Sequence, residues 1–413
     1  MKTNITVRTD LELGVWQGIG GAITEAVAYN FAKLSPEKQQ KFIDAYYGAN
    51  GADYRWLRIS IGSNDFCLAP YEYTKKRSLK DFSIDHDREL ILPMLKKVVA
   101  KKELKIIAAP WSPPSCLKTT HMTRFGGTLK PWRYGRYAKY IRKWLDAYAA
   151  EDVKVDYLSP QNEPHAIQKW ESCIFSYRGQ RRLAYKYLAR ELADYDLQIL
   201  LWDHNKAKFE QVADRLLNGK YVTEFGRDKK VAGLCYHWYN GTYPEKMWAV
   251  RQKYPDIMMV SSEMCCGHSS YDAKNWANAS NPYYRELLSD INTGASAWLD
   301  WNMLLSWQGG PSYCGNYCAS PVIMNEAGDD FILTPIYDAL KTFSQMFPAG
   351  SQVIRCEISS DQVAAVARKV GKGYEVVVAN VSDDDKNQDV TIRIGDAEKQ
   401  ISLKKLEIKK LKF

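Results

Sequence analysis

Lys105-Ile-Ile-Ala-Ala-Pro-Trp-Ser112 is the stretch from which the fold of this chain can be inferred. It is a short apolar run, an amphipathic helical pattern follows it over residues 134–150, and a second apolar run occupies residues 155–163. This order of strand, helix and strand is typical of βαβ units, which build parallel sheets. We therefore expect an α/β fold with a parallel sheet at its centre.

The same alternation extends in both directions along the chain. Eight apolar runs occur, at residues 17–22, 54–62, 105–112, 155–163, 198–204, 231–239, 257–264 and 294–302. Helical patterns lie between them, at residues 36–47, 87–102, 134–150, 179–195 and 282–291. Eight β-then-α repeats predict a closed (β/α)8 TIM barrel.

The pattern changes after the eighth run. A last helix is predicted over residues 333–347, and beyond it come period-two strands at 363–367, 374–380, 390–394 and 401–413. The first 16 residues also have the pattern of a strand. We therefore predict two domains: a catalytic barrel over 17–346, and a small all-β sandwich built from 1–16 together with 347–413.

Composition narrows the possible functions. The 413 residues are 46% hydrophobic and 25% charged, which is ordinary for a globular protein. The net charge of +9 is dispersed among acidic residues, and Gly18-Ile-Gly20-Gly21 is a weak match to a phosphate loop, so we expect no nucleic-acid partner. The 27 Tyr and 13 Trp either pack in the core or hold sugar rings.

Short segments of the sequence bear on membrane association, cellular location and metal binding. No apolar run is long enough to span a membrane, so we expect no integral membrane association. The start lacks the apolar stretch of a signal peptide, which predicts a cytoplasmic protein, or a secreted one if a leader was removed. The nine cysteines have the spacing of buried thiols, and the six histidines form no ligand motif. We expect no metal and no cofactor, and the oligomeric state stays open.

The chemistry is expected at the carboxyl ends of the barrel strands. Two glutamates stand there: Glu163 ends the fourth run and Glu263 ends the seventh. Hydrolysis of a glycosidic bond needs such a pair, one protonated to assist the leaving oxygen and one ionised to attack or stabilise the anomeric carbon. The alternative for each glutamate is a structural ion pair with Arg58.

A series of motifs then resembles one family. Asn162-Glu163-Pro164 with Glu263 is similar to the clan A glycosidases, and the full series resembles glycoside hydrolase family 30, the glucosylceramidase family. The further motifs are Gly18-Ile-Gly-Gly-Ala22, Ala109-Pro-Trp-Ser-Pro-Pro114, His237-Trp-Tyr239, Ser262-Glu-Met-Cys265, Trp298-Leu-Asp-Trp-Asn302, Gly309-Gly-Pro311, Ser320-Pro-Val-Ile323 and 343–352.

The resemblance implies a role for each strand-end residue. It implies that Glu163 is the acid/base and Glu263 the nucleophile. The other roles it implies are charge support of the nucleophile (Arg58), contact with the outer hydroxyls of the sugar (Asp65, Trp111), a bond to the 2-hydroxyl (Asn162), orientation of the nucleophile (His237, Tyr239), stacking (Trp301) and an assisting amide (Asn302). For His237 the alternative is a core histidine.

These roles together predict a retaining β-glycoside hydrolase that acts on β-glucosides or β-gluco-oligosaccharides. Glucosylceramide or internal β-1,6-glucan bonds are the alternative substrates, because Ala319 and Trp307 depart from the glucosylceramidase pattern near the leaving-group side. The alternative from another functional class is a barrel that binds sugars without catalysing a reaction. Both glutamates are present, which favours the enzyme.

Overall fold

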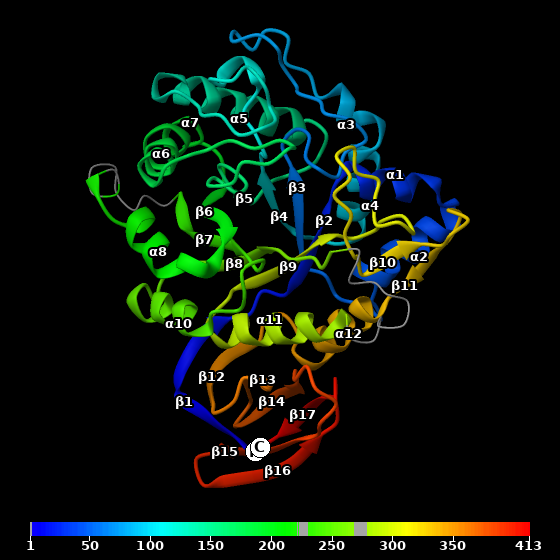
Figure 1. Cartoon of the computed structure of the whole chain (residues 1–413), viewed down its shortest axis with the longest axis vertical. Coiled ribbons are helices and arrows are strands. Elements are labelled where there is room, and N and C mark those ends of the chain that lie inside the picture. Colours follow the sequence, from blue (N-terminus) through cyan, green and yellow to red (C-terminus); the bar gives the residue numbers. More distant parts are fainter. Residues whose placement is uncertain (1, 221, 223–229, 268–278) are drawn as a thin grey trace.

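The computed structural model describes residues 2–220, 222, 230–267 and 279–413, and Figure 1 shows a barrel beside a separate β domain. Eight parallel strands close the barrel in chain order. Each predicted apolar run overlaps one of them, so the predicted (β/α)8 barrel is confirmed. The strands are β2 (Ile19–Ile23), β3 (Trp56–Ser60), β4 (Lys105–Ala109), β5 (Tyr157–Leu158), β6 (Gln198–Asn205), β7 (Val231–His237), β8 (Met258–Glu263) and β9 (Ala297–Asn302).

Helices surround the barrel (Figure 1). They are α1 (Glu25–Lys33), α2 (Pro36–Tyr47), α3 (Asp85–Glu89), α4 (Ile91–Lys101), α5 (Tyr134–Ala149), α6 (Tyr177–Arg181), α7 (Ala189–Glu191), α8 (Phe209–Leu217), α10 (Pro244–Lys253), α11 (Asn281–Asn292) and α12 (Pro335–Met346), with a π-helical turn over Arg182–Leu188. Local sequence sets their starts: Ser35 accepts a bond from the Lys38 N–H at 3.3 Å and Pro36 follows it, which begins α2. Within the described ranges, no helix combines the length and the apolar character needed to cross a membrane.

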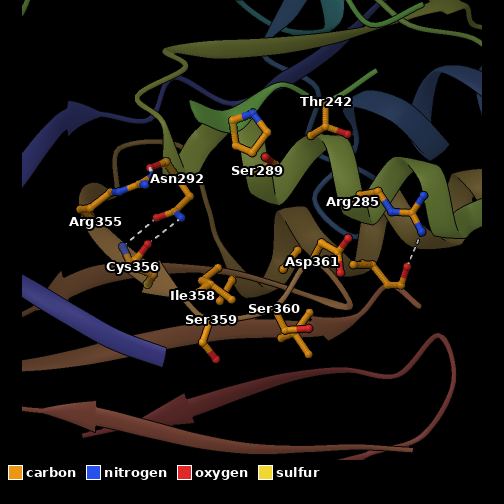
Figure 2. Close-up of a pocket in the computed structure, with 15 residues that line it drawn as sticks. Thr242, Arg285, Ser289, Asn292, Arg355, Cys356, Ile358, Ser359, Ser360 and Asp361 are labelled. Atoms are coloured by element: carbon orange, nitrogen blue, oxygen red, sulfur yellow. Dashed lines mark hydrogen bonds between the residues drawn. The ribbon is translucent and has the colours of Figure 1, made fainter. Parts of the chain in front are cut away.

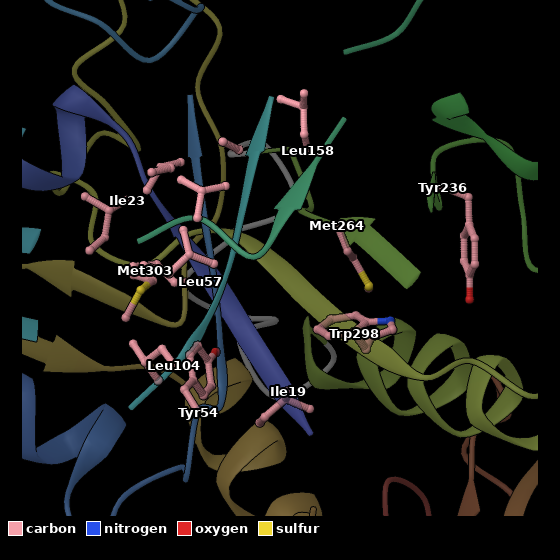
Figure 3. Packing of buried hydrophobic residues seen from close by; sticks show 14 of the residues in the cluster. Ile19, Ile23, Tyr54, Leu57, Leu104, Leu158, Tyr236, Met264, Trp298 and Met303 are labelled. Atoms are coloured by element: carbon pink, nitrogen blue, oxygen red, sulfur yellow. The ribbon is translucent and has the colours of Figure 1, made fainter. Parts of the chain in front are cut away.

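Alternate side chains of the strands pack in two separate layers. Trp56, Ile107, Leu200, Val260 and Leu299 form a cluster inside the barrel. Their neighbours along each strand face the helices, in the larger core that Figure 3 shows from close by. This alternation follows from the two-residue period of a strand. Where the alternation continues, as from Trp56 to Arg58 and from Leu299 to Trp301, the next interior side chain lies toward the mouth of the barrel.

The β domain is one seven-stranded sheet in the order β16-β15-β1-β12-β13-β14-β17, with every pair antiparallel except β1 with β15. The strands are β1 (Thr3–Val15), β12 (Gln352–Ile358), β13 (Val363–Val370), β14 (Gly373–Asn380), β15 (Gln388–Ile394), β16 (Ala397–Leu403) and β17 (Ile408–Lys412); a hairpin of β10 (Val322–Met324) and β11 (Phe331–Leu333) precedes α12. The sheet encloses its own apolar cluster, to which both β1 and β16 contribute. The N-terminal strand therefore joins the C-terminal segment, as predicted.

One predicted strand of this domain was wrong. Residues 401–413 do not form a single strand, because the chain turns between β16 and β17. Leu406 takes a left-handed φ of 60°, and the Lys404 N–H donates to the Glu407 side chain at 2.8 Å. Apolar residues alternate with polar ones on both sides of this turn, and the adjacent Lys404 and Lys405 are the one break in the pattern between Leu403 and Ile408.

Candidate active site

A cavity of about 350 Å³ opens at the carboxyl end of the barrel strands. Strand ends and the loops after them form its wall. The lining residues are Asp65, Trp111, Asn162, Glu163, Gln168, Trp170, Asn205, Tyr239, Glu263, Cys265, Gly267, Trp301, Asn316, Tyr317 and Cys318. The volume lies at the lower end of the range for small-molecule sites. Both predicted carboxylates therefore face one small space.

Glu263 is the last residue of β8, and only 7% of its surface is exposed. Arg58 Nη1 donates to its Oε2, and the Tyr239 hydroxyl donates to its Oε1 at 2.8 Å. A guanidinium and a phenol that bond to separate oxygens orient a carboxylate and compensate its charge. Glu263 is thus held in one orientation toward the cavity.

Glu163 follows β5, and its backbone is in the left-handed region with φ of 44°. Such a conformation costs about 1–3 kcal/mol for a residue with a side chain. The Glu163 N–H donates to the Asp203 carbonyl at 2.9 Å, which holds the backbone there. Gln168 Nε2 donates to Glu163 Oε2 at 3.3 Å. Strain at this position directs the carboxylate into the cavity.

His237, at the end of β7, lies between the two glutamates. Its Nδ1 is 3.6 Å from Glu163 Oε1 and 3.8 Å from Glu263 Oε1, and its Nε2 is 3.1 Å from Asp203 Oδ1. Burial lowers the pKa of His237, but the charges of Glu263, Asp203 and Glu163 outweigh burial and raise it to about 9. The imidazole therefore carries a proton at neutral pH.

The same contacts act on Glu163 in the opposite direction. Burial raises the pKa of this carboxyl, but the rings of His204 and His237 outweigh burial and hold the pKa well below its usual range. His204 Nδ1 lies 3.3 Å from Glu163 Oε1. In the unliganded site, the two shifts favour an ionised Glu163 beside a protonated His237.

Asp203 completes the buried charge network, and the sequence analysis did not single it out. Its Oδ2 accepts from Arg58 Nη2 at 2.9 Å, and its Oδ1 accepts from the Ser262 hydroxyl at 2.6 Å. Burial raises the pKa of Asp203, but Arg58 and His237 outweigh burial and hold it well below its usual range. The polar run Asp203-His204-Asn205 at the end of β6 was the available signal.

A register shift in β6 explains why Asp203 was missed. Leu200 faces the barrel interior, so strict alternation would turn residue 203 toward the helices. Pairing with β7 shifts between Trp202 and His204, and both Trp202 and Asp203 have positive φ, at 83° and 51°. This bulge brings the Asp203 side chain inside the barrel.

Another part of the cavity wall combines a carboxylic acid, Asp65, with two stacked tryptophans. Trp111 and Trp301 stack with ring centroids 5.1 Å apart at 22°. Asp65 Oδ2 accepts from Asn316 Nδ2 at 2.7 Å, and Asn316 is a second residue that the sequence analysis missed. Burial and the charge of Glu263 raise the pKa of Asp65 to about 7. Flat rings beside a hydrogen-bonding carboxyl are suited to a sugar ring and its hydroxyls.

The structure brings most of the predicted residues together. Seven of the ten line the cavity, and Arg58 and His237 lie directly behind it in contact with the glutamates. Asn162 Oδ1 accepts from Arg58 Nη2 at 2.8 Å. Asn302 is fully buried, accepts a bond from Thr24 at 2.7 Å and does not belong to the cavity wall.

In the part of the chain that the structure describes, no cluster of three His, Cys, Asp or Glu could hold a metal ion.

A second cavity, of about 390 Å³, lies between α11 and strands of the β domain (Figure 2). Arg285, Asn292, Arg355 and Asp361 are on its wall. Asp361 is the one acidic side chain among the described residues that line it, so this cavity lacks the pair of carboxylates that glycoside hydrolysis needs. Of these two cavities, the one at the barrel mouth has the pair of carboxylates.

Several known proteins are similar to this chain over most of its length. The putative glucosylceramidase 3 of Caenorhabditis elegans is 29% identical over 89% of this chain and 74% of its own length. The lysosomal acid glucosylceramidase of Mus musculus is 26% identical over 92% of this chain and 78% of its own length. The crystal structure of SrfJ from Salmonella typhimurium superposes with a TM-score of 0.91 at 26% identity, over 99% of this chain and 92% of that one.

The family assignment comes from the barrel itself. The model of the glycosyl hydrolase family 30 TIM-barrel domain matches residues 16–347. That match covers most of the chain and includes every strand-end residue described above. We conclude that this protein is a glycoside hydrolase and belongs to glycosyl hydrolase family 30.

Proposed function

We propose that the chain is a retaining β-glycosidase in which Glu263 is the nucleophile and Glu163 the acid/base. One observation carries the proposal: Glu163 and Glu263 line one small cavity and have His237 Nδ1 as a common neighbour, at 3.6 and 3.8 Å. Two carboxylates that flank one sugar-sized space are what double displacement requires.

Glu263 forms the covalent intermediate in this proposal. Its carboxylate attacks the anomeric carbon, the bond from that carbon to the leaving oxygen breaks, and a glycosyl-enzyme results. Arg58 and Tyr239 hold the attacking carboxylate in place through Oε2 and Oε1. Arg58 is fully buried, so its charge acts on Glu263 with little screening by water.

Glu163 moves the proton. In the unliganded site the raised pKa of His237 and the lowered pKa of Glu163 favour the proton on His237, whose Nδ1 is 3.6 Å from Glu163 Oε1. We propose that the proton passes to Glu163 when substrate excludes water from the cavity. Glu163 then donates it to the leaving oxygen. In the second half-reaction Glu163 takes a proton from water, which attacks the anomeric carbon and releases Glu263.

The sugar held next to Glu263 is proposed to be a terminal β-glucosyl unit. Asp65, Trp111 and Trp301 lie together on the wall of the cavity, where they would contact its hydroxyls and its face. Relatives named glucosylceramidases over most of this chain support glucose as the sugar. Small soluble β-glucosides and β-gluco-oligosaccharides are the proposed substrates.

The experiment follows the first-formed anomer by proton NMR during hydrolysis of aryl β-glycosides. Glucoside, xyloside, fucoside and galactoside are compared with each other, with glucosylceramide and with β-1,6-glucan. We expect the aryl β-glucoside to be the fastest substrate and the β-anomer to appear first. First release of the α-anomer would show inversion and reject the mechanism. Binding of sugars without turnover of any substrate would indicate a silent barrel.

A further inference from the structure

Two cysteines meet at the edge of the catalytic cavity. All nine cysteines of the chain are free thiols, and the sulfur atoms of Cys265 and Cys318 are 3.0 Å apart. That separation is about 1 Å longer than a disulfide bond. The two side chains already point at each other, so bond formation needs only a small movement.

The backbone holds both cysteines in this arrangement. Cys265 follows Glu263 by two residues, and Cys318 lies in the loop after β9. Gly267 forms an isolated bridge with Cys318, the Ala319 N–H donates to the Cys266 carbonyl at 2.8 Å, and the Cys318 N–H donates to Gly309 at 3.0 Å. Main-chain bonds on both sides therefore fix the distance between the thiols.

The cavity gives small oxidants access to the pair. Cys265 and Cys318 are 7% and 6% exposed, and both belong to the wall that also carries Glu263. The contact with Cys265 and burial raise the pKa of the Cys318 thiol. The thiolate is the reactive form, so oxidation is expected to be slow at neutral pH and to quicken as the pH rises.

We propose that Cys265 and Cys318 form a redox-sensitive pair whose oxidation to a disulfide lowers the activity of the enzyme. With hydrogen peroxide, one thiol becomes a sulfenic acid and releases one water, and the second sulfur then attacks it and releases another. The two thiols lose two protons and two electrons, and the peroxide takes up both and is reduced to two waters. The effect on activity rests on the proposed role of Glu263.

Both cysteines lie close to residues of the catalytic site, so a disulfide between them would affect that site. The Tyr239 hydroxyl lies 3.5 Å from Cys265 Sγ and 2.8 Å from Glu263 Oε1, so movement of this sulfur disturbs the group that orients the nucleophile. Cys318 is two residues from Asn316, which bonds Asp65 at 2.7 Å. A displacement of about 1 Å near reacting groups can lower the rate by about 100-fold.

The test oxidises the full chain with hydrogen peroxide at several pH values, after removal of reductant. Remaining thiols are blocked, peptides are mapped by mass spectrometry, and hydrolysis of an aryl β-glucoside is measured before treatment, after it and after dithiothreitol. We expect one linked peptide pair joining Cys265 to Cys318, with two of the nine thiols lost. Activity should fall by about 10- to 100-fold and return with the reductant.

Three variants separate this pair from other thiols, each compared with its own untreated activity. Cys265→Ser and Cys318→Ser should lose the reversible response, and Cys314→Ser, which removes a thiol of the same loop, should keep it. Reversible inactivation without the Cys265–Cys318 link, or the link with full activity, would overturn the proposal. A chain that is inactive before oxidation would instead reject the glycosidase function and the effect on activity, and the peptide map would still decide the pairing.

Discussion

Arg58 Nη2 donates a 2.9 Å hydrogen bond to Asp203 Oδ2, and neither side chain is exposed to solvent. The other arm of the same guanidinium bonds Glu263. Asp203 therefore shares the Arg58 guanidinium with Glu263, and it also bonds His237 and Ser262. This buried aspartate links the nucleophile to the proton-bearing histidine, and it is a positioning residue.

Loss of the Asp203 charge should strongly destabilise the fold. Asp203→Asn removes one of the two carboxylates that bond Arg58 and the carboxylate that bonds His237 Nε2, and losing one partner of a buried ionic network costs about 3–5 kcal/mol. Urea unfolding measures the change. The matched control is Asp194→Asn, which breaks the solvent-exposed pair with Arg142 and should change stability little. Equal losses in the two variants would contradict the buried network.

The two glutamates should separate by their dependence on the leaving group. Glu263→Gln should abolish turnover of every substrate, because the glycosyl-enzyme cannot form. Glu163→Gln should spare the first step for dinitrophenyl glycosides, whose leaving group needs no proton. Burst and steady-state rates on dinitrophenyl and alkyl glucosides provide the comparison. Equal loss in both variants on the activated substrate would show that the roles are assigned wrongly.

The alkaline limb of kcat/KM should follow His237. The pKa of this histidine is raised to about 9, so the proton that Glu163 needs is present below that pH and lost above it. In His237→Gln the limb should move to lower pH, because Glu163 must then hold the proton alone. A pH profile of both proteins on an alkyl glucoside tests this. If the alkaline limb does not move in His237→Gln, another group is responsible for it.

The stability that His237 contributes should fall over a defined pH window. Its pKa is raised in the folded state above the unfolded value of about 6.5, so folding binds the proton more tightly. The contribution is fully present below pH about 6.5 and is lost as pH rises through about 9. Urea unfolding across this range should show the decline in the natural chain, and His237→Gln should remove the decline. If the free energy of unfolding falls with pH equally in both proteins, His237 does not make this contribution.

Trp301→Ala should weaken sugar binding. The ring stacks on Trp111 and lines the cavity, and removing a buried side chain of this size costs about 1–3 kcal/mol. Calorimetric titration with a β-thioglucoside that is not hydrolysed measures the affinity. Trp132→Ala, at an indole that is 73% exposed, serves as the control and should leave the affinity unchanged. Unchanged affinity in Trp301→Ala would remove this ring from the sugar site.

Much of this protein could be predicted from its sequence because the informative patterns are local. Strand and helix periods repeat over a few residues, so the eight strands and the last helix could be located without knowledge of their partners. The strand ends of a barrel always gather at one mouth, so Glu163 and Glu263 could be assigned to one site from their positions alone. The turn at Leu406 was missed because its signal in the sequence is small: only the adjacent Lys404 and Lys405 interrupt the alternation there.

Only the tertiary structure decided which side chains touch. Strict alternation turns Asp203 outward, and the bulge in β6 that brings it to Arg58 depends on its pairing with β7. The sulfurs of Cys265 and Cys318 are 53 residues apart in sequence, and main-chain bonds between two loops bring them to 3.0 Å. Sequence periodicity determines the face that a residue occupies along a regular strand. Barrel closure, register and bulges determine its neighbours, because they join segments that are far apart in the chain.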